Sequence, residues 1–111
     1  MVRLYIPDRG DIIWLDFNPQ AGREQSGHRP AFVVSPQAYN KISHLAIACP
    51  ITSKSKGWRF EVKLVGLQTN GVILTDQIKS LDLRMRNSTF IERASDEIIR
   101  DVLAKIEVLV T

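Results

Sequence analysis

A carboxylate, an imidazole and a guanidinium lie within six residues of one another in the stretch EQSGHRPAFVVS. They belong to Glu24, His28 and Arg29, and the residues that follow are mostly apolar. This change predicts that a polar loop passes into a strand, and a strand holds the side chains at its end in fixed positions while a loop supplies reach. Such a place suits proton transfer and the binding of a charged substrate.

Two further polar places follow later in the chain. Thr52 and Ser53 stand where the apolar run LAIACPI ends, and Asp76 and Gln77 interrupt an apolar stretch within TDQIKS. Together with Arg29, the cations near these places indicate a phosphate-bearing ligand, because guanidinium and ammonium groups pair with phosphate oxygens. These cations are Lys54, Lys56, Arg59, Lys79, Arg84 and Arg86.

Each of these residues also has an ordinary structural interpretation. Arg29 alone would usually form a surface ion pair, Thr52 is most often a turn hydroxyl, and a histidine beside a glycine usually faces solvent. Asp76 could satisfy backbone donors, as buried carboxylates often do. Trp14 and Trp58 have side chains that pack in cores more often than they stack on bases.

The sequence indicates neither a metal site nor a serine hydrolase. His28 and His44 are too far apart to form a helical pair of ligands, and Cys49 has no second thiol near it. The G-x-S-x-G turn of the hydrolases is missing from the sequence. We therefore expect no metal and no cofactor.

Length and composition bound the remaining possibilities. The 111 residues have the length of one ordinary domain, so residues 1–111 are expected to fold as a single unit. The single cysteine favours a reducing compartment, and we expect a cytoplasmic protein. The chain has no signal-peptide pattern and no run near the roughly 18 apolar residues of a membrane span, so a soluble protein is expected. The net charge of +3 suits an anionic partner.

Short strands and one long helix are expected to position the polar residues. Alternating or continuous apolar patterns predict strands over residues 10–17, 31–35, 45–51, 59–64, 71–82 and 87–93, with a helical turn over 37–42. Asn70 and Gly71 predict a tight hairpin turn, and residues 18–28 a loop of about ten residues. Ser95 can cap a helix whose apolar stripe runs from Ile98 to Val110. The pattern predicts a mainly β fold with α, namely a small curled antiparallel sheet of the SH3-like β-barrel kind with a C-terminal helix.

Four stretches carry a specific combination of motifs over nearly the whole chain. They are PDRGDIIWLDFNPQAGREQSGHRPAFVVSPQAYN, CPITSKSKGWRFEVKL, GVILTDQIKSLDLRMR and a C-terminal helix ending in IEVLV. On GDIIW, E-Q-x-G-x-RP, PIT and DQ-x-x-x-x-D at these spacings, the sequence resembles the MazF/PemK (Kid) toxin family. The resemblance implies the CcdB/MazF-type toxin fold in a homodimer. It also implies a ribosome-independent, metal-independent endoribonuclease that cuts single-stranded RNA at short sequences, as the toxin of a toxin–antitoxin pair.

The same resemblance assigns catalytic roles. It makes Arg29 of the RP motif and Thr52 of the PIT motif the catalytic pair, and Glu24 a catalytic or substrate-contacting residue. Attack of a 2'-OH on the neighbouring phosphorus would gather charge on the non-bridging oxygens, where Arg29 and Thr52 can donate hydrogen bonds. Glu24 is the better-matched base and His28 could donate a proton to the departing 5'-oxygen, which would give 2',3'-cyclic phosphate and 5'-OH ends.

RNA contacts are expected on the loops of residues 18–28 and 52–59 and near TDQIKS, because splayed bases need a polar rim. The expected RNA-binding residues are Trp14, Gln25, His28, Ser53, Lys54, Lys56, Asp76, Gln77, Lys79 and Arg86. In the Kid/PemK branch a histidine commonly stands at the position of Arg23 and an arginine at that of Leu74. Since both are missing here, Asp76 is assigned a secondary role in positioning substrate.

The resemblance also implies a MazE-like antitoxin, whose disordered acidic C-terminal segment would fold across the basic groove. The apolar face of the C-terminal helix and residues 81–83 are candidate dimer contacts, and packing of that helix on its own barrel is the equal alternative. Two other functions stay open: a CcdB-like toxin that binds DNA gyrase without RNA cleavage, and a non-catalytic RNA-binding barrel. The combination of Arg29 and Thr52 argues against both.

Overall fold

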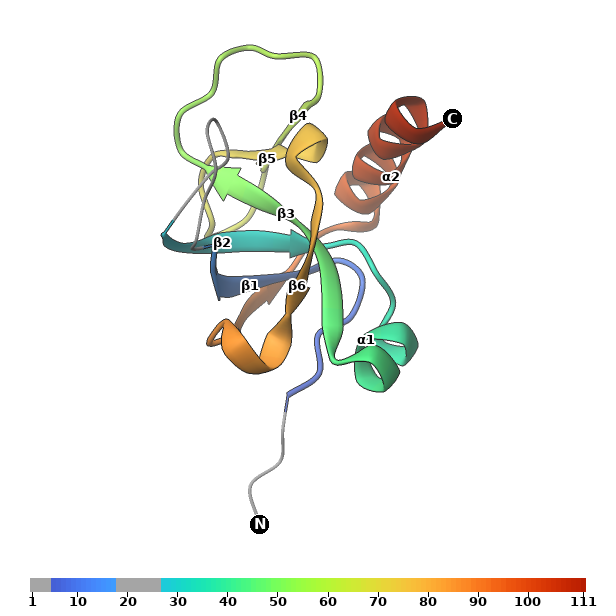
Figure 1. Cartoon of the computed structure of the whole chain (residues 1–111). Coiled ribbons are helices and arrows are strands. Elements are labelled where there is room, and N and C mark those ends of the chain that lie inside the picture. Colours follow the sequence, from blue (N-terminus) through green and yellow to red (C-terminus); the bar gives the residue numbers. More distant parts are fainter. Residues whose placement is uncertain (1–4, 18–26) are drawn as a thin grey trace.

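Antiparallel strands form the centre of the molecule in a computed structural model that describes residues 5–17 and 27–111 (Figure 1). The strands are β1 (Asp11–Asp16), β2 (His28–Val33), β3 (Leu45–Thr52), β4 (Glu61–Lys63), β5 (Val72–Leu74), β6 (Lys79–Asp82) and β7 (Thr89–Arg93). The helices are α1 (Gln37–Ser43) and α2 (Asp96–Val110), and two 3-10 turns are η1 (Thr75–Gln77) and η2 (Leu83–Met85).

The sheet is curled around the long strand β3. Its strand order is β4-β5-β3-β2-β1-β7, and β6 pairs with β3 off this path. The first half of β3 pairs with β6 and its end pairs with β5. Within the described residues the outer strands β4 and β7 do not pair with each other, so the sheet is not closed. The predicted mainly β fold with a C-terminal helix is confirmed, with an open sheet.

Two apolar clusters lie on the two sides of this sheet, because successive side chains of a strand point to opposite faces. Ile12 faces the first cluster with Phe32 and Cys49, and helix α2 packs there. Ile13 faces the second cluster together with Ala31. The start of β1, the end of β2 and most of β3 are therefore buried on both faces, which fixes the register of these strands and the positions of the residues at their ends.

Helix α2 begins after Ser95 as the sequence predicts, and its first turns pack on the core of this chain, which is one of the two expected arrangements. The Ser95 hydroxyl accepts a hydrogen bond from the backbone N–H of Ile98 at 3.2 Å, which caps the first turn. Ile98 and Val102 are buried in the first cluster. At the other end, Val110 is 71% exposed, so the predicted apolar stripe continues past the core of this chain.

Two predictions about the second half of the sheet are wrong. In the β4–β5 pair Lys63 lies opposite Val72, so residues 64–71 form the connection and the tight turn at Asn70 and Gly71 does not exist. The strand predicted over residues 71–82 is broken by η1. The cause is the curl of the sheet, since β5 and β6 pair with different halves of β3.

Strand β2 starts three residues earlier than predicted and runs through Pro30. Pro30 lies opposite Trp14 of β1, whereas pairing with β3 begins only at Ala31. At Pro30 the strand therefore has a neighbour on one side, a position at which a proline is tolerated in a sheet. The consequence is that His28 and Arg29 belong to the strand itself.

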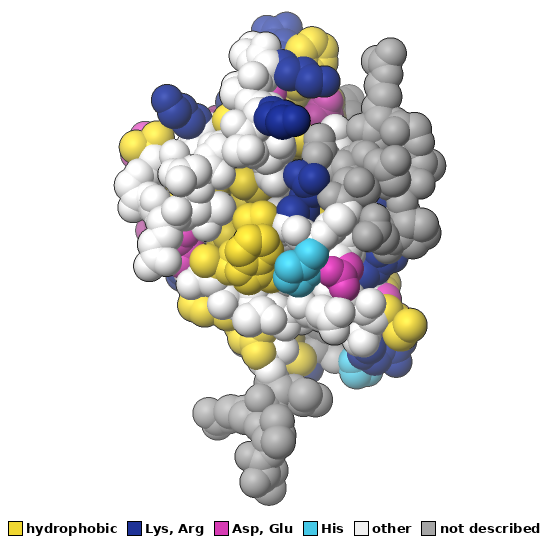
Figure 2. All heavy atoms as spheres, turned by 90° about the vertical axis from the view of Figure 1, so that its left-hand side faces the viewer, with side chains coloured by type: hydrophobic (Ala, Val, Ile, Leu, Met, Phe, Trp, Pro, Cys, Tyr) yellow, Lys and Arg dark blue, Asp and Glu magenta, His cyan; other side chains and the backbone are white. Residues whose placement is uncertain are grey.

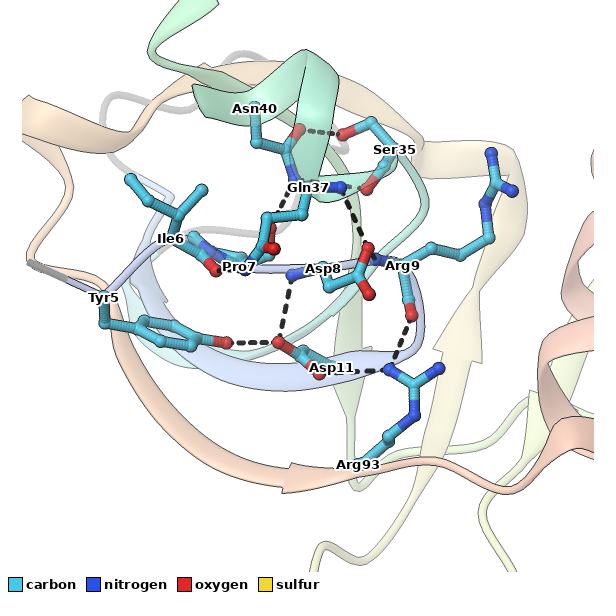
Figure 3. A network of polar contacts seen from close by, with 10 residues as sticks. All are labelled: Tyr5, Ile6, Pro7, Asp8, Arg9, Asp11, Ser35, Gln37, Asn40 and Arg93. Carbon is cyan, nitrogen blue, oxygen red and sulfur yellow. Dashed lines mark hydrogen bonds and ion pairs between the residues drawn. The ribbon is translucent and has the colours of Figure 1, made fainter. Parts of the chain in front are cut away.

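The segment before β1 is tied to the sheet by polar contacts (Figure 3). The Asp11 carboxylate accepts hydrogen bonds from the Tyr5 hydroxyl, from the Asp8 backbone N–H at 3.0 Å and from Arg93 Nη1 at 3.3 Å. Burial, followed by the bond to Asp11, raises the pKa of Tyr5 well above its ordinary value. These contacts join residues 5–8 to β1 and to its neighbour β7.

A second part of the same network is buried beside α1 (Figure 3). The fully buried Asn40 donates from Nδ2 to the carbonyl oxygens of Pro7, at 2.8 Å, and Ser35, at 3.1 Å. The Ser35 hydroxyl accepts from the Ile47 backbone N–H at 2.9 Å. Within the described residues no buried side-chain polar atom lacks a hydrogen-bond partner. Burying this network therefore costs little folding free energy.

Candidate active site

A groove of about 890 Å³ lies over the start of β2 and the end of β3. Five separate segments line it, and its residues are Trp14, Arg29, Pro30, Ile51, Thr52, Ser53, Lys54, Lys56, Gln68, Thr69, Asn70 and Ile91. On the face seen in Figure 2, Lys and Arg side chains gather beside an apolar area, with a histidine and an acidic side chain next to it. The groove combines an apolar floor with cationic and amide groups, which suits a nucleic-acid strand.

Arg29 and Thr52, far apart in the sequence, meet in this groove. Arg29 lies at the start of β2, and its Nη1 donates a hydrogen bond to the carbonyl oxygen of Ile51 at 3.3 Å. Thr52 is the last residue of β3 and is 9% exposed. Its Oγ1 accepts a hydrogen bond from the backbone N–H of Lys54 at 3.2 Å. A guanidinium and a hydroxyl are thus held by strand ends in one groove.

Gly71 allows β5 to approach the backbone of Thr52. A Cβ atom at Gly71 would lie 2.2 Å from the Thr52 carbonyl oxygen and 3.1 Å from Ser53 Cα. The backbone φ of Gly71 is also +117°, a conformation that other residues rarely adopt. Gly71 is therefore required by the packing around Thr52, although its sequence context indicates only a turn.

His28 forms a polar and aromatic cluster beside the groove. Its ring stacks on Trp14 with centroids 5.3 Å apart and planes at 9°. Its Nδ1 lies 2.6 Å from Asp16 Oδ1, and Asp16 Oδ2 accepts a hydrogen bond from Asn87 Nδ2 at 2.9 Å. The hydrogen bond with His28, and then that with Asn87, lowers the pKa of Asp16. The Asp16 carboxylate therefore stays charged and orients the imidazole.

His28 and Arg29 are neighbours in sequence, but their side chains point to opposite faces of β2. Asp16 lies opposite His28, and Leu15 lies opposite Arg29. Because side chains alternate along a strand, His28 and Arg29 leave β2 on opposite faces. His28 does not line the groove itself, and it contacts the groove through Trp14.

Comparison with known proteins identifies the family. The model of the PemK-like, MazF-like toxins of type II toxin–antitoxin systems matches residues 8–110. The chain belongs to this family. The endoribonuclease toxin MazF of Escherichia coli K12 is 46% identical over 110 residues, which cover 99% of each chain. The endoribonuclease PemK of Escherichia coli is 32% identical over 109 residues, covering 94% of this chain and 82% of PemK.

Solved structures of MazF proteins have the same fold. The crystal structure of MazF from Deinococcus radiodurans matches with a TM-score of 0.92 and 46% identity, covering 96% of this chain and 97% of that one. A MazE–MazF crystal structure from the same organism matches with a TM-score of 0.85 and 46% identity, covering 96% of each chain. The resemblance to the MazF/PemK family is confirmed, and these matches do not favour the CcdB-like alternative.

Several residues predicted to bind RNA have clear places in this PemK/MazF-family structure. Ser53, Lys54 and Lys56 line the groove, as does Trp14. The basic loop is held by Glu61, whose carboxylate accepts from the Lys56 backbone N–H at 3.0 Å and from the Ser55 hydroxyl at 2.7 Å. These two bonds, that of Lys56 first, lower the pKa of Glu61. The carboxylate therefore fixes the backbone that carries the two lysines.

Four other predicted RNA-binding residues do not line the groove: Asp76, Gln77, Lys79 and Arg86. Asp76 accepts a hydrogen bond from the Trp58 indole N–H at 3.0 Å. Lys79 lies in β6 opposite Ala48, and Gln77 ends η1. Arg86 Nη1 donates to the backbone carbonyl of Asp16 at 3.2 Å.

Glu24 and Gln25, the other residues predicted from the toxin-family motifs, lie outside the described residues, as does Arg23. Leu74, the other position at which this chain departs from the Kid/PemK branch, is buried in β5. A buried leucine at this position cannot serve as the cationic group of that branch.

Sequence reasoning missed one wall of the groove, formed by Gln68, Thr69 and Asn70. Their polar side chains were an available signal, but next to Gly71 they indicated only a turn. Asp16 was missed as well, because its contact with His28 depends on the register of β1 with β2.

Residues 5–17 and 27–111 contain neither a candidate metal-binding cluster nor a candidate membrane span. In these ranges no three or more His, Cys, Asp or Glu side chains are grouped so that they could hold a metal ion. The same part of the chain contains no helix with the length and apolar character needed to cross a membrane.

Proposed function

We propose that this toxin is an endoribonuclease that cuts single-stranded RNA, including mRNA, at short specific sequences and so inhibits translation and growth. The observation that carries the proposal is the meeting of Arg29 and Thr52 in a groove that Lys54 and Lys56 also line. Support comes from relatives at 46% and 32% identity that are named endoribonucleases. A guanidinium and a hydroxyl are donors suited to a phosphate group.

The proposed reaction uses the substrate's own 2'-OH as nucleophile. The 2'-oxygen forms a bond to the adjacent phosphorus, the bond from phosphorus to the 5'-oxygen breaks, and the products carry a 2',3'-cyclic phosphate and a 5'-OH. Negative charge develops on the non-bridging oxygens, where Arg29 and the Thr52 hydroxyl donate hydrogen bonds. DNA lacks this nucleophile, so the reaction is selective for RNA. The protein's own donors supply this stabilisation, and we propose that no metal ion is needed.

Two protons must move in this reaction. We assign removal of the 2'-OH proton to Glu24, on the strength of its place in the E-Q-x-G motif. We assign proton delivery to the 5'-oxygen to His28. Asp16 forms a hydrogen bond with Nδ1 of this imidazole. Nε2 is therefore the ring nitrogen left to exchange a proton with the substrate. Trp14, on which the His28 ring stacks, lines the groove, so His28 would reach a nucleotide at this edge of the groove.

RNA would bind along the groove and beyond it. Lys54, Lys56 and Ser53 would contact the phosphates nearest the cut, and Trp14 would stack on a base. The remaining predicted contacts lie outside the groove or outside the described residues, and we assign them to flanking nucleotides. They are Gln25, Asp76, Gln77, Lys79 and Arg86.

We further propose a cytoplasmic homodimer that a MazE-like antitoxin neutralises. Support for the antitoxin comes from MazE–MazF structures of related proteins and from the net charge of +3, which suits an acidic segment across the groove. Leu81 is buried in the core of its own chain, so dimer contacts would come from exposed apolar residues such as Met85 and Val110. Sedimentation of the free protein would measure the oligomeric state.

The test is direct. Purified protein is incubated in EDTA with a long single-stranded RNA and with the DNA of the same sequence, beside an Arg29→Ala variant, and the ends are mapped. Discrete cuts in RNA, none in DNA and none with the variant are expected. Intact RNA with folded wild-type protein would contradict the proposal, and a gyrase-binding assay would then examine the CcdB-like alternative.

A further inference from the structure

Residues 64–71, the loop between β4 and β5, form one wall of the groove. The proposed reaction assigns no role to this wall. Gln68, Thr69 and Asn70 line the same groove as the catalytic pair. Gln68 and Asn70 are exposed, and each side-chain amide offers both hydrogen-bond donors and an acceptor. Exposed amides beside a phosphate-binding site are the kind of group that hydrogen-bonds a base edge.

Glu92 of β7 holds the middle of this loop. Its Oε1 accepts a hydrogen bond from the Gln68 backbone N–H at 3.1 Å. Its Oε2 accepts from both the backbone N–H and the hydroxyl of Thr69, each at 2.7 Å. Burial tends to raise the pKa of Glu92, but the bonds from Thr69 and Gln68 outweigh burial and lower that pKa. The charged Glu92 carboxylate thus fixes the backbone between the exposed side chains of Gln68 and Asn70.

The rest of the loop is anchored to the core and to the site. The Leu64 N–H donates to the Gly71 carbonyl oxygen at 3.0 Å, and Leu64 is buried. Leu67 packs against the first apolar cluster. Gly71 lies against the backbone of Thr52. The loop therefore has a fixed position relative to the catalytic threonine, and ordering it on binding RNA would cost little entropy.

We propose that the 64–71 loop determines sequence specificity: the amides of Gln68 and Asn70 hydrogen-bond base edges beside the cut, and Glu92 is the positioning residue that holds them there. This inference rests on the proposed RNA cleavage. The phosphate and the 2'-OH are the same in every nucleotide, so the catalytic pair alone cannot select a sequence. Unpaired bases expose their Watson–Crick edges, and an amide presents a matching donor beside an acceptor.

The experiment compares cut sites on one long RNA of mixed sequence. Gln68→Met keeps the length of the side chain but removes its hydrogen bonds, and Asn70→Ala removes the second amide. Glu92→Gln weakens the hold on the loop. Glu107→Gln makes the same charge change on the exposed end of α2 and serves as the matched control. Sequencing the ends gives the preference at each position, and a short RNA gives kcat and KM.

Each amide variant is expected to lower the preference for one base beside the cut by about tenfold, the typical effect of losing a base contact. Glu92→Gln is expected to relax the same positions and to raise KM more than it lowers kcat, while Glu107→Gln matches the wild type. Wild-type preference at every position in both amide variants would overturn the inference and leave RNA cleavage standing. Uncut RNA with the wild type would overturn the cleavage proposal as well. If Glu92→Gln melts early, the two exposed amides still decide the question.

Discussion

Arg29 Nη1 donates a hydrogen bond to the carbonyl oxygen of Ile51 across 3.3 Å. Ile51 directly precedes Thr52 in β3, so this bond ties the guanidinium of β2 to the strand end that carries the hydroxyl. The two donors of the proposed site therefore keep a constant separation. Such preorganisation is what makes a donor effective when charge develops on a phosphate.

Arg29→Ala is expected to lower the cleavage rate by about 10²- to 10³-fold, the usual effect of losing one such donor. Arg29→Lys should restore little, because an ammonium cannot bond Ile51 and a phosphate with the fixed geometry of a guanidinium. Single-turnover cleavage of a short RNA measures the effect. Arg100→Ala, a change of an exposed cation on α2, is the control. A fully active Arg29→Lys enzyme would show that geometry does not matter here.

Gly71→Ala is expected to lower both the melting temperature and the cleavage rate. The added Cβ would meet the Thr52 carbonyl oxygen at 2.2 Å, so the end of β3 must move. Gly57→Ala is the matched control, because Gly57 also has a positive φ, +67°, but nothing lies within 4 Å of its added Cβ. The control should lose about 1 kcal/mol from backbone strain alone. Equal losses in both variants would contradict a specific role for Gly71.

Asp16→Asn is expected to change how stability depends on pH. Hydrogen bonds from His28 and then Asn87 lower the pKa of Asp16 in the folded protein. A carboxylate with a lowered pKa stabilises the fold above its ordinary pKa and loses this effect as the pH falls through the folded value. The wild type should therefore be the more stable protein near neutral pH, and the difference should shrink below about pH 4. Thermal unfolding of both proteins across this range measures the difference, and a pH-independent difference would refute the prediction.

Cys49 is expected to be unreactive in the folded protein. Burial, with a smaller contribution from Asp76, raises the pKa of this thiol to about 12. The reactive thiolate is therefore almost absent at neutral pH, and the sulfur is also shielded. Iodoacetamide should label the protein in denaturant but not under native conditions, as mass spectrometry would detect. Equal labelling rates would show that β3 opens readily.

The parts of the fold with strong local patterns could be predicted from the sequence. Alternation located β1, continuous apolar residues located β3, and Ser95 with the stripe that follows it located α2. Arg29 and Thr52 were singled out as polar residues at the ends of such patterns, while their catalytic roles came from the family resemblance and stay a prediction. These signals succeed because each depends on neighbouring residues alone.

Contacts between distant residues could not be predicted in this way. Glu92 lies 24 positions from Gln68, and its sequence context indicates only a strand residue. The local signal at Asn70 and Gly71 favoured a two-residue turn, but the packing of Leu67 and the bonds to Glu92 stabilise the longer connection. The contact of Asp16 with His28 depends on the pairing register of β1 with β2. A single sequence does not reveal that register.

The groove takes its lining from five segments that begin with Trp14 and end with Ile91. A chain growing on the ribosome has no complete groove until β7 has been synthesised, since the last wall and the carboxylate that holds the 64–71 loop come from that strand. The proposed nuclease site is therefore complete only once residues 89–93 have joined the sheet, and a fragment that stops before β7 should not cleave RNA.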